Sequence, residues 1–453
     1  MNFKNISTTN IKILNFLVLF YPIALMTGNF LTNLNVMLVC ILGIFLYRDK
    51  ILSLEQIKSN LLIFLFFFIL ILITILNLEL NKDENNILKS FLYLRYFVFL
   101  LVIKYMFENN DIDLKKFLIL CLFLTTFISL DVLLQAVTDK NIFGMIKNLH
   151  SGHSSGIFGK EAIAGSYIQR FFLFAIICLP FISKKINKTN LLIIFSLILI
   201  FFTAILFSGN RMPFFIFFIS LVLMAILVRE LRLTFSMGIL FSLIIFIFSL
   251  FLNERVLKNY GNFYAHSPKI ILDVFKFSGK KYPELENKKY NDFTTEYNTG
   301  MDSEKLKKKY ELLPFRSGHA VVFLTAIDTW RDSILFGSGL KSFRTKCKNK
   351  LHLPNRVCTS HPHNYYLELL NDTGLVGSIL LLIGIFYSIK NKFHNYRNFT
   401  INEKLFMFSI LVLLLSEFFP LRSSGGFFTT NNSSFIFFLL GILCSSKNIK
   451  KVN

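Results

Sequence analysis

Residues 358–377 read CTSHPHNYYLELLNDTGLVG, and residues 378–389 continue as SILLLIGIFYSI. A polar segment with two histidines therefore passes directly into an apolar run. A helix needs about 20 mainly apolar residues to cross roughly 30 Å of hydrocarbon. This stretch predicts the point at which a long hydrophilic loop re-enters a membrane, with His363 at the membrane surface.

The rest of the chain repeats the apolar part of this pattern. The 453 residues are 54% hydrophobic, include 55 Phe and are only 17% charged, which is too apolar for a soluble domain of this size. We predict a single all-α integral membrane domain over residues 1–453, with about 12 transmembrane helices. The apolar runs are 11–27, 31–47, 61–77, 88–106, 116–136, 163–183, 190–207, 211–228, 235–252, 364–389, 403–421 and the shorter 434–444.

Basic residues in the short connections set the predicted orientation, because Lys and Arg resist translocation. Alternate connections carry them, as in 48–58, 184–188 and 390–404, whereas 79–84 is net acidic. Both termini are therefore placed in the cytoplasm, and the large loop 253–362, between transmembrane helices 9 and 10, is placed outside. The net charge of +22 follows largely from this topology. With no nucleic-acid motif beside it, we predict no nucleic-acid partner.

Five charged side chains lie in the outer halves of the predicted spans or at an outer connection. Charges inside a membrane are costly and usually face the bundle interior or a water-filled cavity. One interpretation is an ion pair that holds helices together, and the other is a polar cavity open to the outside. As a set, they favour the cavity. They are Arg95, Asp131, Arg170, Arg211 and Glu417.

The end of the long loop has a more regular pattern than its lysine-rich middle. From Arg316 to Ile334, apolar residues recur at helical spacing, which predicts an amphipathic helix lying on the bundle. The glycines of FGSGLKSF, residues 336–343, then break this helix. Cys347 and Cys358 follow in the same loop, where an oxidising compartment allows a disulfide and two free thiols are the alternative.

Two polar residues stand directly before the apolar run. Asn364 can serve as the N-cap of the coming helix, whose N-terminus attracts phosphate. Arg211 and Arg316, with Arg170 as a third candidate, supply forked donors suited to a diphosphate. His363 titrates near neutral pH and can accept a hydroxyl proton. These residues predict transfer from a phosphate-linked donor to a hydroxyl acceptor.

A metal site is the weaker alternative for the same segment. It would use Cys358, His361 and His363, but Pro362 separates the histidines and no second ligand pair has conventional spacing. We therefore predict neither a metal nor another cofactor.

At these residues the chain resembles the superfamily of O-antigen ligases and O-antigen polymerases, which are glycosyltransferases of the bacterial envelope. The family pattern is His, then Asn or Ser, nine residues, Gly, two residues and Gly. It is present here as His363, Asn364, Gly374 and Gly377. Without the resemblance, the two glycines would be interpreted as close-packing positions. Residues 155–170, 208–211 and 336–343 also resemble family segments, so the recognisable region covers about residues 150–390.

The resemblance implies a metal-independent, inverting transferase of the GT-C type in the bacterial inner (cytoplasmic) membrane, surrounded by membrane lipids. Its donor would be an undecaprenyl-diphosphate-linked glycan and its acceptor lipid A-core or another glycan, in lipopolysaccharide or surface polysaccharide biosynthesis. His363 would deprotonate the acceptor hydroxyl at a site facing the periplasm, and Arg211 would hold the diphosphate. Arg316, Arg170 and Arg331 compete for the role of second arginine.

Several activities share these motifs. A ligase joins a finished glycan to lipid A-core, whereas a polymerase joins repeat units on the lipid carrier, and the sequence does not separate the two. Transfer to a protein hydroxyl uses the same chemistry. A transporter or glycolipid flippase is an alternative of a different class, but it would need charges that reach both sides of the membrane and paired broken helices.

Overall fold

The computed structural model describes residues 3–77, 85–147, 153–183, 186–261, 318–353, 356–422 and 425–445. Within these ranges the regular structure is helical, apart from an isolated antiparallel bridge between Lys140 and Ile146. The predicted all-α class is confirmed. Arg316 and residues 262–317 of the long loop lie outside the described residues, so the predictions made for them stay predictions.

The apolar runs of the sequence fold as helices with closely similar bounds. Eight helices of the described ranges are long and apolar enough to cross a membrane, and three shorter apolar helices accompany them. The protein is therefore a multi-pass membrane protein, while the count of about 12 spans stays a prediction. The helices of the bundle are α1 (Phe3–Thr27), α2 (Asn29–Ile51), α4 (Leu61–Leu76), α6 (Asn85–Tyr93), α7 (Arg95–Asn109), α8 (Leu114–Thr138), α9 (Ala164–Ser183), α10 (Lys188–Ser208), α11 (Arg211–Leu227), α12 (Arg232–Leu252), α19 (Tyr365–Phe393), α20 (Ile401–Glu417) and α21 (Thr430–Leu443).

Helix α9 occupies the interior of the bundle. In its apolar window 83% of the residues are buried, against 17% in the span that contains α12. Phe171, Phe172 and Phe174 of α9 are fully buried. A charge on α9, such as Arg170, therefore lies inside the protein and must find its partners there.

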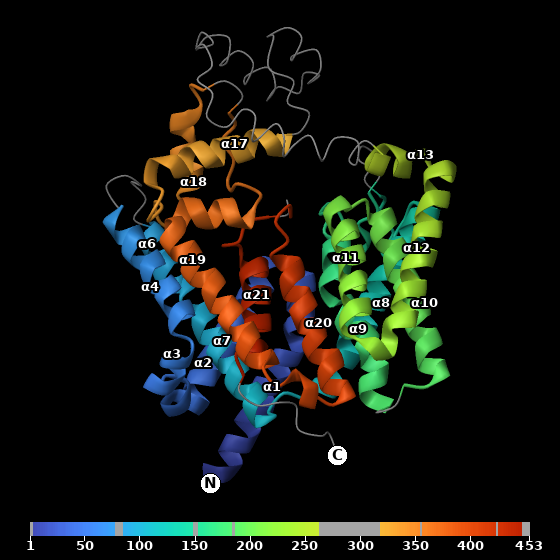
Figure 1. Cartoon of the computed structure of the whole chain (residues 1–453), viewed down its shortest axis with the longest axis horizontal. Coiled ribbons are helices and arrows are strands. Elements are labelled where there is room, and N and C mark those ends of the chain that lie inside the picture. The colour runs from blue at the N-terminus through green and yellow to red at the C-terminus, as the bar shows by residue number, and fades with distance from the viewer. Residues whose placement is uncertain are drawn as a thin grey trace.

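The apolar run 364–389 corresponds to α19, which is a candidate span but is not continuous. Gly374 has φ 63° and ψ −165°, which interrupts the helix. Residues 365–373 lie across one end of the bundle, and residues 375–393 then descend through it (Figure 1). Only glycine adopts such a backbone conformation at low cost.

The turn formed by residues 336–343 fills this break. The N–H groups of 338 and 339 donate to the carbonyls of 371 and 372 at 2.8 and 2.9 Å. On the other side, the N–H groups of 375 and 376 donate to the carbonyls of 334 and 335 at 3.0 Å each. The backbone groups left open at the two new helix ends are thus satisfied within the protein, as burial requires.

The side chain of Asp372 holds the same turn. Its Oδ2 accepts from the N–H of Lys341 at 2.6 Å, and its Oδ1 accepts from the N–H and hydroxyl of Ser342 at 3.1 and 3.0 Å. The N–H of Leu340 donates to Thr74 Oγ1 of α4 at 3.0 Å. The glycine turn is therefore fixed to two helices of the bundle.

Helix α17 (Gly318–Trp330) lies across the same end of the bundle, next to α18 (Phe343–Lys346) and α19 (Figure 1). It is the described part of the amphipathic helix predicted between Arg316 and Ile334. Helix α1 begins and α21 ends at the opposite end (Figure 1). Which end faces the cytoplasm stays a prediction.

Candidate active site

The segment that leads to His363 is anchored to α17. Arg356 Nε donates to Asp328 Oδ2 at 2.6 Å, and both side chains are largely buried. The N–H of Val357 donates to Thr325 Oγ1 at 3.1 Å. These two contacts attach the loop segment that precedes the histidines to α17.

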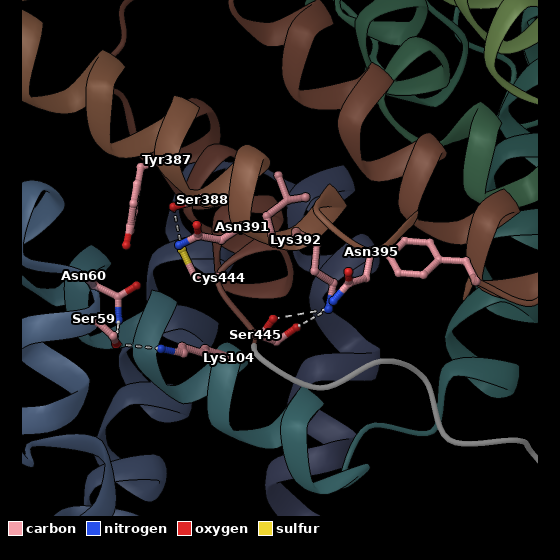
Figure 2. Close-up of a pocket in the computed structure, with 12 residues that line it drawn as sticks. Ser59, Asn60, Lys104, Tyr387, Ser388, Asn391, Lys392, Asn395, Cys444 and Ser445 are labelled. Atoms are coloured by element: carbon pink, nitrogen blue, oxygen red, sulfur yellow. Dashed lines mark hydrogen bonds between the residues drawn. The ribbon is translucent and has the colours of Figure 1, made fainter. Parts of the chain in front are cut away.

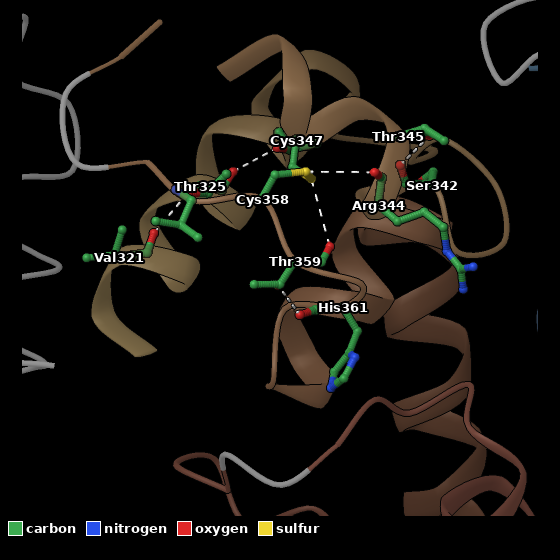
Figure 3. The surroundings of a disulfide bond; sticks show 11 residues. Val321, Thr325, Ser342, Arg344, Thr345, Cys347, Cys358, Thr359 and His361 are labelled. Carbon is green, nitrogen blue, oxygen red and sulfur yellow. Dashed lines mark hydrogen bonds between the residues drawn. A yellow bond between two sulfur atoms is a disulfide. The ribbon is translucent and has the colours of Figure 1, made fainter. Parts of the chain in front are cut away.

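Cys347 and Cys358 form a disulfide that closes the loop between them, with Cα atoms 5.2 Å apart (Figure 3). Of the two alternatives left open by the sequence, the structure contains the bonded one. Cys347 packs with Val322 and Ala326 of α17. The disulfide also removes the Cys358 thiolate from the alternative metal site. Among the described residues, no three His, Cys, Asp or Glu side chains are grouped so as to hold a metal ion.

His363 stands where this loop turns into α19. Its φ of 57° places it in the left-handed region, which histidine tolerates better than bulky or β-branched residues. Asn364 is the N-cap, as predicted, and its Oδ1 accepts from the N–H groups of Tyr366 and Leu367 at 3.0 and 3.2 Å. Its amide also donates to the carbonyl of Pro420 at 2.7 Å. The cap therefore occupies two of the N–H groups at the N-terminus of α19 that were predicted to attract phosphate.

Three histidine rings gather at this point, and we call them the histidine cluster: His319, His361 and His363. The ring centroids of His361 and His363 are 4.2 Å apart, and those of His319 and His363 are 5.4 Å apart with the rings nearly perpendicular. His319, which comes from α17, was not predicted from the sequence as a site residue. A signal for it was its position three residues after Arg316 on the predicted amphipathic helix.

Each ring of the cluster is held toward its neutral form. Burial lowers the pKa of His363. The pKa of His319 is lowered first by desolvation and then by the charges of His363 and Arg211. His319 itself is exposed. Burial, followed by the charges of His363, Arg344 and Lys341, lowers the pKa of His361 to about 4. A neutral imidazole at neutral pH is able to accept a proton.

The surroundings of the cluster are positively charged. Arg211 acts electrostatically on His319, while Lys341 and Arg344 act on His361. The atoms His361 Nε2 and Arg344 Nε are buried and have no hydrogen-bond partner among the described residues. Buried polar atoms are normally satisfied, so oxygen atoms of a ligand are a natural complement for them. The sequence analysis did not single out Lys341 or Arg344.

Arg211 is positioned by the turn before α11. Asn210 donates from Nδ2 to the carbonyl of Ala162 at 2.7 Å and accepts at Oδ1 from the N–H of Gly165 at 2.9 Å. The turn is thereby fixed to the start of α9. Nδ1 of His153 lies 3.1 Å from the Ser208 carbonyl in the same turn. Burial lowers the pKa of His153. The hydrogen bond to the Ser208 carbonyl raises this pKa, and the charge of Arg211 lowers it.

Arg170 has different surroundings. Its Nε and Nη2 contact Glu417 Oε1 and Oε2 at 2.9 and 3.1 Å, and Nη2 also donates to Asn432 Oδ1. Glu417 is fully buried, pairs with Arg422 at 2.9 Å and accepts from the Tyr365 hydroxyl at 3.2 Å. Arg170 thus belongs to a buried ion-pair network, and the sequence analysis did not identify Arg422.

The remaining charges in the spans have separate partners. Arg95 donates to the Leu92 carbonyl at 2.7 Å and to the Tyr96 hydroxyl at 2.9 Å, within its own helical segment. Asp131 accepts from the N–H of Ile142 at 2.8 Å and so supports a loop. The contacts therefore do not support the prediction that all five charges share one cavity.

The fold and this site define a class: a multi-pass, all-α membrane protein with neutral imidazoles and cationic side chains gathered at one end. The comparison with known families makes this more specific. Residues 195–382 match the O-antigen ligase family, which supports membership of the chain in the O-antigen ligase and polymerase superfamily. The match includes Arg211, His363, Gly374 and Gly377, whereas Arg170 precedes it. Membership implies lipid-linked glycans as substrates in general and a glycosyltransferase-like activity. No curated protein sequence matches the chain.

Proposed function

We propose that the protein is a glycosyltransferase of the O-antigen ligase type, which transfers a glycan from an undecaprenyl-diphosphate-linked donor to a hydroxyl acceptor such as lipid A-core. The observation that carries this proposal is the histidine cluster, held neutral beside Arg211 within the matched family region. A transfer of this kind needs a base for the acceptor and cations for the leaving diphosphate, and in this proposal the histidine cluster and Arg211 supply them.

In this reaction His363 accepts the proton of the acceptor hydroxyl as its oxygen attacks the anomeric carbon. The bond from that carbon to the diphosphate oxygen breaks, and the diphosphate leaves with the electron pair. Attack from the face opposite the diphosphate inverts the anomeric configuration. Cations placed where the negative charge develops stabilise the transition state, so the reaction can proceed without a metal ion.

Arg211 is our first candidate for the diphosphate-binding cation, because its charge acts on the histidine cluster. Arg316 stays a candidate and lies outside the described residues. Arg170 is less suited, because Glu417 and Asn432 already accept hydrogen bonds from its guanidinium group. Arg344, with a buried Nε that lacks a partner among the described residues, is an additional candidate.

Orientation is part of the proposal. Disulfides persist in oxidising compartments, so the bond between Cys347 and Cys358 supports a periplasmic location for the histidine end and cytoplasmic termini. The site would then face the outer side of the inner membrane, as the distribution of basic residues also predicts. A polymerase joining lipid-linked repeat units has the same requirements at this site.

The broken helix does not favour transport. In transporters, the open ends of discontinuous helices bind substrate or ions. Here the backbone groups at the break of α19 are occupied by residues 334–339 of the protein itself.

The test is replacement of His363 by Gln in the native host, with His394→Gln as the matched control. His394 is exposed and lies beyond the far end of α19, away from the cluster. Both variants are first checked for normal amounts in the membrane, and lipopolysaccharide is then profiled together with lipid-linked glycan. Loss of capped lipopolysaccharide with long lipid-linked chains accumulating means a ligase. Accumulation of single repeat units means a polymerase. An unchanged profile for His363→Gln would remove the catalytic role and with it the proposal.

A further inference from the structure

A cavity of about 370 Å³, shown in Figure 2, lies at the end of the bundle opposite α17 (Figure 1). It is lined by the end of α3 (Leu54–Ser59), the start of α4 and the last turns of α7, α19 and α21. Its charged lining residues are Lys104 and Lys392, and the residues described around it include no lining Asp or Glu. The proposed transfer reaction does not use this cavity.

Both lysines are buried, and each donates to a neutral oxygen atom. Lys104 is 4% exposed and donates to Ser59 Oγ at 3.0 Å. Lys392 is 7% exposed and donates to Ser445 Oγ at 2.9 Å and to its carbonyl at 3.2 Å (Figure 2). Burying two ammonium groups on one cavity is costly unless negative charge compensates for them.

Three acids act electrostatically on the lysines. Glu108, one turn after Lys104 on α7, acts electrostatically on both lysines. Glu55 acts on Lys104 from α3 (Leu54–Ser59), and Glu403 acts on Lys392 while its carboxylate is bound in the capping box of α20. None of these carboxylates lines the cavity, so its interior presents ammonium and amide groups.

The amides are the second feature that fits an oxyanion. Asn391 and Asn395 line the cavity with the lysines. Asn60 lines it too, but its amide already donates to the Gln56 carbonyl at 2.8 Å and to Ser59 Oγ at 3.0 Å. Asparagine side chains donate hydrogen bonds through their NH₂ groups, and phosphate oxygens accept such bonds readily. A polar cavity with two cations and the amides of Asn391 and Asn395 is therefore matched to a phosphate group.

The position of the cavity connects it with the bilayer. Tyr387, at its edge, is 51% exposed on the apolar face of α19, while Phe399 and Leu443 supply a buried apolar wall. The adjacent helix α3, between α2 and α4, exposes Leu54 by 74%. Basic pockets between transmembrane helices bind anionic lipid headgroups.

We propose that this cavity binds a phosphate group, carried by the headgroup of an anionic phospholipid, between Lys104 and Lys392. A lipid held there would bridge α4, α7, α19 and α21 at the end of the bundle opposite the histidine cluster. Free inorganic phosphate has the same chemistry, and the experiment separates the two sources.

The experiment measures thermal unfolding of the purified full chain in phosphatidylcholine nanodiscs, with increasing fractions of phosphatidylglycerol or with added inorganic phosphate. The expected result is a higher Tm with phosphatidylglycerol. Replacement of one lysine by Gln should weaken the apparent affinity about fivefold, and replacement of both should abolish the response. Lys390→Gln is the matched control, because Lys390 is exposed on the same end of α19 and does not line the cavity. It should respond as the wild type does.

If Lys104→Gln with Lys392→Gln fails to fold, Lys104→Gln alone decides, since the Lys104 ammonium is positioned by a single serine hydroxyl among the described residues. A rise with inorganic phosphate that is as large as the rise with lipid would support the site and identify free phosphate as its occupant. An equal Tm with and without phosphatidylglycerol, or a rise that survives in the lysine variants, would overturn the proposal.

Discussion

Replacing Gly374 by Ala tests how the break in α19 is built. Gly374 has φ 63° and ψ −165°, a conformation that costs a residue with a Cβ about 1–3 kcal/mol. The new Cβ would also collide with the carbonyl group of Leu335 and would lie 2.5 Å from the N–H nitrogen of Gly337. These are backbone atoms, which cannot move out of the way by a change of rotamer as a flexible side chain can.

Relief of the collision requires residues 334–337 to withdraw from α19. The hydrogen bonds from the N–H groups of 375 and 376 to the carbonyls of 334 and 335 would then be lost. A buried hydrogen bond contributes about 1 kcal/mol, so the two add about 2 kcal/mol to the strain. We expect Gly374→Ala to destabilise the protein by about 3–5 kcal/mol, a large part of the stability of a typical domain.

The assay is thermal unfolding of the purified variants in one detergent, with Gly144→Ala as the matched control. Gly144 has φ 77°, but nothing lies within 4 Å of the position of its Cβ. Its replacement adds backbone strain without a collision, so we expect a loss of only about 1 kcal/mol. If Gly374→Ala unfolds at the same temperature as Gly144→Ala, the glycine turn does not pack against the break as described.

Three further predictions concern the site and its support. Replacing both Cys347 and Cys358 by Ser should lower stability by about 2–4 kcal/mol, and reductant should bring the wild type to the same Tm; a wild type insensitive to reductant would contradict this. Glu417→Leu leaves two buried guanidinium groups without their carboxylate and should cost about 3–5 kcal/mol, measured as Tm or yield of folded protein; an unchanged Tm would mean that the ion-pair network is not a stabilising contact. Since burial lowers the pKa of His363, the transfer rate should stay constant as pH falls through 6.5 and decline only at lower pH, where the ring becomes charged; a decline centred above 6.5 would contradict a base of lowered pKa.

Hydropathy was sufficient to predict most helices, because a membrane span requires a long apolar run whatever its neighbours are. It could not predict the break in α19. Gly374 lies within the stretch 364–389, which predicts one span, and its backbone conformation depends on residues 334–339, which approach it only in the folded protein. From the sequence, Gly374 was interpreted as a position of close helix packing. In the structure, it accommodates the backbone of the glycine turn instead.

The candidate site shows the same division. His363 and Asn364 could be singled out because loop and helix meet at adjacent residues of the sequence. Arg170 and Glu417 are 247 residues apart in the sequence. Both could be recognised as charges inside spans, but their pairing could not be predicted. His319 reaches His363 only because α17 folds back over the start of α19.

The measurement that tests the central claim most directly compares donor binding and single-turnover transfer in purified wild type, His363→Gln and Arg211→Gln, using an undecaprenyl-diphosphate-linked glycan and an excess of acceptor. If His363 is the base, His363→Gln should still bind the donor but transfer glycan about 10²–10⁴ times more slowly, while Arg211→Gln should also lose donor affinity. Transfer by His363→Gln at the wild-type rate would contradict the account.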